Sequence, residues 1–364
     1  MANPDFVIAG GGIIGLSLAL ELNRRGASVV VLEAGTAARQ TSSAAAGMLA
    51  VTDPANPRQL HTLAELSASL YPGFLDRIAG LSGVAVPFQT ETTLQECTPA
   101  DPHALAEPRM LVPGLAPDAP FFRLLQERSV DPRQLAHALR AAVLQTSIAL
   151  HEHTALESLQ INADGVRIET AHDTFHAEKI IDCMGSWSPA PVSPRKGQML
   201  AVAAPPGLDL RSAVRCEAIY IVPRTSGPHA GRLIVGATIE DAGFDLSVHP
   251  RDILALNARA VRLIPALAEA QFLESWSGLR PSTADGLPIL GASAAQPRYV
   301  LATGHFRNGI LLAPATAEVV AQTMFGEPTS VNLAPFSPER FRAPEAEDPM
   351  VVAASITAHG SRKS

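Results

Sequence analysis

The sequence predicts a mixed α/β fold in which a nucleotide-type unit precedes a region of antiparallel strands. Three observations support this prediction. Residues 6–33 read as strand, Gly-rich turn, helix and strand. Residues 197–290 contain apolar runs of strand length separated by turns, and residues 299–325 again read as strand, turn and helix. A chain of 364 residues also predicts two or three domains.

The first unit follows from its local apolar pattern. Phe6–Ala9 is a short apolar run of strand length, and the glycines after it end that strand. Ile13–Arg25 carries a long apolar helical face, which Gly26 terminates. Ser28–Leu32 reads as a second buried strand, and Arg39–Ala50 as a small-residue stretch suited to close packing against a ligand.

The middle of the chain is less regular. Residues 57–78 have a helical pattern that we expect to break near Pro72. Asp131 and Pro132 predict the start of another helix, because Asp caps helices and Pro fits their first turn. Further strands are expected at 148–151, 166–169 and 179–183.

Composition excludes several classes of partner. The net charge is -7 and Lys occurs only three times, so the chain has no basic stripe for a nucleic acid. No apolar run approaches the roughly 20 residues that cross a bilayer, which predicts no membrane association. Three scattered cysteines favour a reducing, cytoplasmic setting. The sequence contains no CxxC or HExxH pattern, so it does not predict a metal site.

Gly10, Gly12 and Gly15 form a GxGxxG pattern between the first strand and the first helix. In that setting the glycines permit a tight turn, approach of a pyrophosphate and close packing of helix on strand. The helix N-terminus then faces the anion. Glu33 ends the second strand, where a carboxylate can accept from ribose hydroxyls. These residues predict a dinucleotide site, with a structural Gly-rich turn as the alternative.

A second Gly-rich turn, Gly304–Gly309, precedes the last predicted helix. A nicotinamide dehydrogenase needs one such turn for each cofactor, whereas a flavin site commonly uses a second backbone element to hold its ring. A helix N-terminus there also favours negative charge on a reduced flavin. The two turns together therefore favour FAD over NAD.

Other short motifs occur in order between the two turns and beyond. They are Ser43–Leu49, Tyr220–Arg224, Val235–Thr238, Trp276–Pro281 and Gly304–Thr316. Together with the first Gly-rich turn they resemble those of glycine oxidase, the thiamine-pathway member of the D-amino-acid oxidase superfamily. The resemblance extends from residue 6 to about residue 325, and it is weak over 90–128 and in the tail.

The resemblance implies a Rossmann-like FAD-binding domain beside a substrate domain with a large antiparallel sheet. It also implies non-covalent FAD, a small amino-acid substrate, oxygen as acceptor, and a homotetramer or another homo-oligomer. We expect the FAD-binding domain at 1–56, 129–190 and 288–336, the substrate-binding domain at 57–128 and 191–287, and a flexible tail at 337–364.

The same resemblance implies two sets of cofactor-binding residues, one from each half of the FAD-binding domain. The first set joins the GxGxxG turn to the small-residue stretch, and the second surrounds the last turn. A backbone contact near Leu156 and contacts at Gly185 and Trp187 are expected in addition. The expected residues are Gly10, Gly12, Ile13, Ile14, Gly15, Glu33, Ala34, Thr41, Ser42, Ala46, Gly47, Met48, Leu156, Gly185, Trp187, Gly304, His305, Phe306, Arg307, Asn308, Gly309, Ile310 and Leu311.

For catalysis the resemblance implies that Arg280 grips the substrate carboxylate, helped by the Tyr220 hydroxyl and by Arg307. A guanidinium matches a carboxylate bidentately. The alternatives are an ion pair of Arg280 with Asp285, a packing role for Tyr220, and a flavin contact for Arg307. The expected pocket residues are Ile239, Met48 and His305; glycine oxidases often carry Met at the position of Ile239.

These residues predict oxidation of glycine, or of a small amine or D-amino acid, to the imine or oxo acid with release of hydrogen peroxide. A place in thiamine (thiazole) biosynthesis is part of this prediction. Alternatives are a sarcosine or small D-amino-acid oxidase, a quinone-linked dehydrogenase, an NAD-linked dehydrogenase and a non-catalytic nucleotide-binding module. Sarcosine oxidases of this superfamily hold FAD through a cysteine near the last turn, and residues 217–364 contain none.

Overall fold

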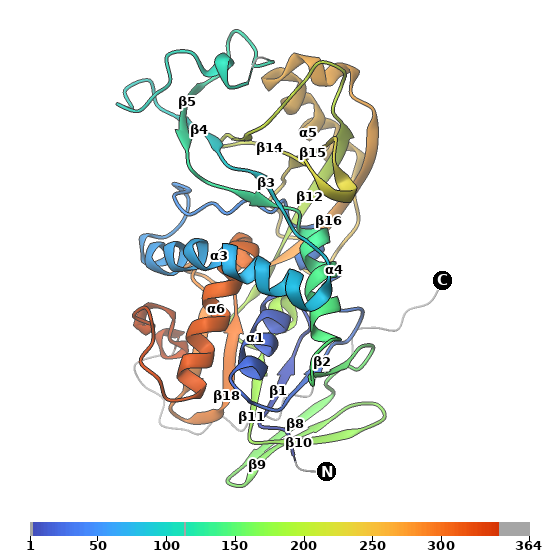
Figure 1. The fold of residues 1–364 in the computed structure, drawn as a ribbon, viewed down its shortest axis with the longest axis vertical. Helices are drawn as coiled ribbons and strands as arrows, with labels where there is room; N and C mark the ends of the chain where they lie inside the picture. The colour runs from blue at the N-terminus through green and yellow to red at the C-terminus, as the bar shows by residue number, and fades with distance from the viewer. Residues whose placement is uncertain (1–2, 113, 342–364) are drawn as a thin grey trace.

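The structure is a computed structural model that describes residues 3–112 and 114–341. Two large sheets lie in opposite halves of an elongated molecule (Figure 1). The long strands β12 (Ser193–Ala203) and β16 (Phe272–Ser282) of one sheet extend toward the other (Figure 1). Helices α1 (Ile13–Arg24), α3 (His61–Ser82), α4 (Pro132–Val143) and α6 (Gly309–Met324) lie around the middle of the molecule, and α5 (Pro250–Leu263) lies at the upper end (Figure 1). The predicted mixed helix-and-sheet fold is confirmed.

The first sheet has six strands in the order β17-β18-β11-β1-β2-β7. Its strands pair in parallel except for the antiparallel edge pair of β17 with β18. Strand β1, which leads into the first Gly-rich turn, therefore lies between its sequence neighbour β2 and the distant strand β11. The strands are β1 (Phe6–Ala9), β2 (Val29–Leu32), β7 (Ala149–His151), β11 (Lys179–Asp182), β17 (Ile289–Ser293) and β18 (Gln296–Thr303).

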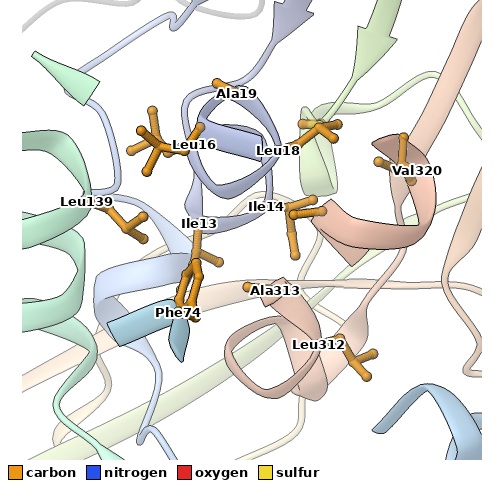
Figure 2. Packing of buried hydrophobic residues seen from close by; sticks show 14 of the residues in the cluster. Ile13, Ile14, Leu16, Leu18, Ala19, Phe74, Leu139, Leu312, Ala313 and Val320 are labelled. Atoms are coloured by element: carbon orange, nitrogen blue, oxygen red, sulfur yellow. The ribbon is translucent and has the colours of Figure 1, made fainter. Parts of the chain in front are cut away.

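Four helices build the core beside this sheet. Their apolar faces pack against one another, as Ile14 of α1 and Val320 of α6 do in Figure 2. Asp131 accepts from the N–H groups of Arg133 and Gln134, so the expected cap of α4 is present. The four helices are α1 (Ile13–Arg24), α3 (His61–Ser82), α4 (Pro132–Val143) and α6 (Gly309–Met324), and the short helix α2 (Thr41–Ala44) lies in the small-residue stretch.

The expected break at Pro72 is wrong, because α3, which is 22 residues long, continues through that residue. A proline inside a helix costs about 3 kcal/mol. Tyr71, Phe74 and Ile78 are nevertheless buried in the core, and the Tyr71 hydroxyl donates to the Ile310 carbonyl over 2.5 Å. Burial of such side chains contributes roughly 1.5–3 kcal/mol each, which outweighs the proline.

The second sheet has seven strands in the order β16-β12-β15-β14-β13-β4-β5. One face packs under α5 (Pro250–Leu263) in an apolar cluster, and the opposite face meets the segment that contains Ala46 and Met48. The strands are β4 (Thr93–Cys97), β5 (Phe121–Leu125), β12 (Ser193–Ala203), β13 (Ala213–Arg215), β14 (Tyr220–Pro223), β15 (Arg232–Gly236) and β16 (Phe272–Ser282).

Smaller elements complete the fold. The hairpins β8 (Ser158–Asn162), β9 (Gly165–Glu169) and β10 (Thr174–Ala177) form a three-stranded sheet, and β3 (Phe88–Thr90) pairs with β6 (Ser129–Val130). The short 3-10 helices are η1 (Arg58–Leu60), η2 (Pro108–Met110), η3 (Gly185–Trp187), η4 (Gly227–His229), η5 (Pro265–Glu269), η6 (Phe306–Asn308), η7 (Ala334–Phe336) and η8 (Pro338–Phe341).

The start of the expected tail has contacts in the structure. Arg340 in η8 donates from Nε to Asp285 Oδ2 over 2.7 Å and from Nη2 to the Leu287 carbonyl over 2.8 Å. The rest of that expected tail, 342–364, lies outside the described residues.

Candidate active site

The GxGxxG turn is packed so tightly that Gly10 and Gly15 have no room for a side chain. Gly10 has a φ of +103°, and a Cβ there would lie 2.5 Å from the Cys183 carbonyl oxygen after β11. A Cβ on Gly15 would lie under 3.0 Å from the Gly10 carbonyl oxygen. Around Gly12 a Cβ would meet only Ser42 Oγ, at 3.4 Å, so this backbone is open to a close approach.

Glu33 links the first Gly-rich turn to the loop that follows β2. Its Oε2 accepts from the Gly11 N–H and its Oε1 from the Gly35 N–H, both over 2.8 Å. A carboxylate has about four acceptor positions, so two such bonds leave capacity for ribose hydroxyls. At the start of α1, the Ile13 N–H donates to Ser42 Oγ over 2.9 Å. The remaining first-turn N–H groups have no intrahelical acceptor, as at any helix start.

The small-residue stretch is attached to the second sheet by three hydrogen bonds. Thr41 Oγ1 donates to the Leu279 carbonyl over 2.7 Å, and Trp276 Nε1 donates to the Ala44 carbonyl over 3.0 Å. The Arg224 Nη2 donates to the Ala46 carbonyl over 2.9 Å. The expected cofactor residues at 41–48 therefore lie between the first Gly-rich turn and the face of the second sheet.

Arg224 is a buried cation with spare hydrogen-bonding capacity. Burial lowers its pKa to about 10, and Asp131, with an oxygen 4.0 Å from its Nε, opposes that shift. Its Nη1 is buried and has no hydrogen-bond partner among the described residues. A buried donor without a partner is costly, which suits a site that receives the oxygen atoms of a bound group.

The second Gly-rich turn connects β18 to α6. Gly304 has a φ of +75° and Phe306 a φ of +47°, so the chain turns through two left-handed residues. Asn308 Nδ2 donates to Asn56 Oδ1 over 3.0 Å, which fixes the turn to the loop after the small-residue stretch. The sheet order places this turn beside η3, where Thr303 Oγ1 donates to the Gly185 carbonyl over 3.2 Å.

His305 lies in the same turn, fully buried, with its Nε2 3.0 Å from Thr316 Oγ1. Burial lowers its pKa to about 3, so the ring is neutral at physiological pH.

The neutral state of His305 predicts a loss of stability in mild acid. The unfolded ring takes up a proton near pH 6.5 and the folded ring only near pH 3, so the unfolded state is favoured progressively as pH falls below 6.5. The loss is roughly 1.4 kcal/mol for each pH unit. Denaturant unfolding of wild type and His305→Gln between pH 7 and 5 should show a shallower slope for the variant. Equal slopes would contradict a buried neutral histidine.

Tyr220 and Arg280 project from the same face of the second sheet, on β14 and β16. The Tyr220 hydroxyl is 3.5 Å from Met199 Sδ. Burial raises the pKa of the Tyr220 phenol, while Arg280, Arg224 and Arg307 oppose this rise with their positive charges. Three arginines therefore act on one tyrosine, which makes this face attractive to an anion.

Arg280 is held by carbonyl oxygens. Its Nη1 donates to the Thr238 carbonyl over 3.1 Å and to the Lys196 carbonyl over 3.5 Å. Among the described residues no carboxylate forms an ion pair with Arg280, and Asp285, the expected alternative partner, pairs with Arg340. A guanidinium without a counter-ion remains available for a carboxylate ligand.

Arg307 has acidic and amide partners. Its Nη2 lies 3.0 Å from Asp53 Oδ1 and donates to Asn56 Oδ1 over 3.2 Å. Asp53 Oδ2 is in turn 3.7 Å from Nε of the buried Arg215, whose Nη2 is 2.9 Å from Glu127 Oε2. Arg307 is thus anchored at the edge of the Tyr220 face.

Other expected residues are less enclosed. Ile239 is 63% exposed and Trp187 is 47% exposed, with the Trp187 ring 5.9 Å from that of Phe244. Met48 is half-buried in the cluster that includes Tyr220, whereas the Leu156 side chain packs in a different cluster beside β8 and β9. The structure therefore brings Met48 together with Tyr220 but leaves Ile239 on the surface.

Two further features bear on the sequence predictions. No group of three or more His, Cys, Asp or Glu that could hold a metal ion occurs within 3–112 and 114–341. Over the same residues, no helix is long and apolar enough to span a membrane.

Sequence reasoning did not single out Arg224, Asp53 or Asn56. Arg224 ends the Tyr220–Arg224 motif and directly follows its strand, and that position could have indicated a site residue. Asp53 and Asn56 lie in a loop with turn composition, so their partnership with Arg307 depends on tertiary structure alone.

Comparisons with known proteins agree with this geometry. The family model described as FAD dependent oxidoreductase matches residues 5–323. Glycine oxidase of Geobacillus kaustophilus is 32% identical over 92% of this chain and 96% of its own, and its crystal structure superposes with a TM-score of 0.88 at 30% identity, covering 94% of this chain and 100% of that chain.

A bifunctional ThiO/ThiG protein of Trichormus variabilis is 35% identical over 99% of this chain. This chain spans only 58% of the length of that relative. The match of the family model over most of the sequence, with FAD in its description, identifies the cofactor type. The chain therefore belongs to the FAD-dependent oxidoreductase family.

Proposed function

We propose that this protein oxidises the amine of glycine or of a similarly small amino acid, with FAD as cofactor and oxygen as acceptor. The observation that carries the proposal is the pair of Arg280 and Tyr220 on one sheet face. Arg280 has carbonyl partners but no acidic one among the described residues. The products are the imine, which hydrolyses to the oxo acid, and hydrogen peroxide.

The residues of the two Gly-rich turns and Arg224 fit FAD. The first turn offers a backbone open at Gly12, a helix start and the Glu33 carboxylate, which suit a pyrophosphate and a ribose. The buried Arg224 Nη1, which has no partner among the described residues, and the backbone of the second turn at Gly304 offer further donors. When bound, the flavin supplies a two-electron acceptor that oxygen can reoxidise. Non-covalent attachment is part of the proposal.

The protein's own residues bind and orient the substrate. Arg280 receives the carboxylate through its guanidinium fork, and the Tyr220 hydroxyl donates a hydrogen bond to the same group. Arg307, anchored by Asp53, adds positive charge at the edge of the site. Holding the carboxylate fixes the α-carbon, and orientation of this kind can lower a barrier by as much as about 7–11 kcal/mol.

No side-chain base is assigned to the α-carbon. His305 is neutral, but its Nε2 is engaged with Thr316 and its ring is enclosed. The proposal therefore assigns the protein the binding of the substrate with its amine unprotonated, and bound flavin would supply the acceptor for the α-hydrogen and its two electrons.

Glycine is proposed as substrate because two relatives named glycine oxidase or ThiO/ThiG match most of this chain. Ile239, which the resemblance places in the pocket, is exposed, so D-alanine, D-proline and sarcosine belong to the same test. A supply of imine for thiamine synthesis, a homo-oligomeric assembly, a cytoplasmic location and the two-domain division are also proposals.

A peroxide-coupled screen of the purified protein tests the function. Glycine, sarcosine, D-alanine, D-proline and an L-amino acid are compared at equal concentration under air. We expect the highest kcat/KM with glycine or one of the other small substrates. Activity only with L-amino acids or hydroxy acids would contradict the substrate class, and a colourless protein that does not take up FAD would contradict the cofactor.

A further inference from the structure

Two glycines lie beneath the Arg280 and Tyr220 side chains. Gly197 on β12 pairs with Gly278 of β16, and Arg195 pairs with Arg280, so Gly197 is the diagonal neighbour of Arg280 on the same face. Gly236 at the end of β15 lies directly opposite Tyr220 of β14.

The guanidinium of Arg280 lies against the Gly197 backbone. A Cβ at residue 197 would be under 3.0 Å from Nη1, Nη2 and Cζ of Arg280. All three atoms belong to the planar group, so the plane as a whole occupies the space that a side chain would take. Contacts that short do not occur for real Cβ atoms. Any residue other than glycine would therefore displace the guanidinium.

The Tyr220 ring lies against Gly236 in the same way. A Cβ at residue 236 would lie 2.5 Å from Cζ and 2.7 Å from Cε2 of Tyr220, with the hydroxyl also under 3.0 Å. Neither glycine has a left-handed φ, so φ does not require glycine at either position. What requires it is the space taken by the two functional side chains.

We propose that Gly197 and Gly236 are positioning residues, which keep a side-chain-free floor under Arg280 and Tyr220 so that both can hold one carboxylate. This inference rests on the proposed function, because it assumes that Arg280 and Tyr220 bind the carboxylate.

A side chain added at residue 197 or 236 would disturb the site rather than the fold. The obstructing atoms of Arg280 are the far end of a flexible side chain, which can swing away at little cost. The displaced guanidinium would also leave the Thr238 carbonyl that now receives its Nη1. A displacement of about 1 Å in a catalytic group can cost on the order of 100-fold in rate.

The test compares Gly197→Ala and Gly236→Ala with Gly80→Ala, all as purified holoenzymes. Gly80 lies in α3, and a Cβ there meets nothing within 4 Å, so it is a matched control for the same chemical change. Binding of acetate, which carries a carboxylate but no amine, is measured by calorimetry. Flavin content and melting temperature are measured on the same samples.

We expect both floor variants to keep their flavin and melting temperature while acetate affinity falls at least about tenfold, with kcat/KM for glycine falling by on the order of 100-fold. The control should match wild type. In an Arg280→Lys background, Gly197→Ala should have little further effect, because the group it displaces is already lost. If Gly197→Ala does not fold, the same double-mutant cycle with Gly236→Ala and Tyr220→Phe tests the proposal at Gly236.

Wild-type affinity for acetate in both floor variants, with an active wild-type enzyme, would overturn the floor and leave the proposed function standing. Full additivity in the two cycles would also overturn it. A wild-type protein that neither binds acetate nor oxidises any amino acid would instead overturn the proposed function itself.

Discussion

Arg280→Ala is expected to lower kcat/KM for glycine by about 100- to 1,000-fold without loss of the bound flavin. A charged hydrogen bond contributes about 1.5–3 kcal/mol, and the guanidinium fork makes two of them to a carboxylate. Arg280 has no acidic partner among the described residues, so its removal leaves no buried carboxylate unpaired. Steady-state peroxide formation gives the rates, and visible absorption gives the flavin content.

Two further variants sharpen this prediction. Arg280→Lys keeps the charge but loses the fork, so it should lie between wild type and Arg280→Ala. Arg259→Ala removes an exposed arginine of α5 and should behave as wild type. If Arg280→Ala left kcat/KM for glycine within a factor of about three of wild type, less than the weakest such bond, Arg280 would not be the carboxylate ligand.

Gly15→Ala is expected to give a colourless or FAD-poor protein with a lowered melting temperature. The new Cβ would lie under 3.0 Å from the Gly10 carbonyl oxygen, which is backbone and cannot swing aside. Relief requires α1 to move away from β1, which opens the turn. Overpacking of this kind costs about 1–3 kcal/mol. The ratio of flavin to protein absorbance and a thermal melt with added FAD measure both effects.

Gly73→Ala serves as the control for Gly15→Ala, because a Cβ at residue 73 in α3 meets nothing within 4 Å. It should retain full flavin and gain up to about 1 kcal/mol from better helix propensity. Wild-type flavin content and melting temperature in Gly15→Ala would show that the turn does not need to be so tight.

The elements that the sequence predicted well are those whose signal is local. The first Gly-rich turn, α1 and the Asp131 cap each depend on a few neighbouring residues, and the structure has them within one or two residues of the expected bounds. Pro72 misled the prediction, because its cost is local while the burial of Tyr71 that offsets it is tertiary.

The candidate site was less accessible to sequence reasoning. Arg280 and Tyr220 came from resemblance, and their common face depends on the register of β12, β14, β15 and β16. The anchoring of Arg307 by Asp53 joins residues more than two hundred positions apart, and no local pattern carries such a pairing. Nor does any local pattern distinguish Gly197 from an ordinary strand glycine.

The order of the strands has a consequence for how the protein is made. Gly10 rests on the carbonyl of Cys183, and β1 is flanked by β11, which itself pairs with β18. The N-terminal turn is therefore completed only by segments that leave the ribosome much later. We expect a nascent chain that stops before β11 to lack FAD affinity, and loading to occur only near the end of translation. Such distant pairings also predict slow folding.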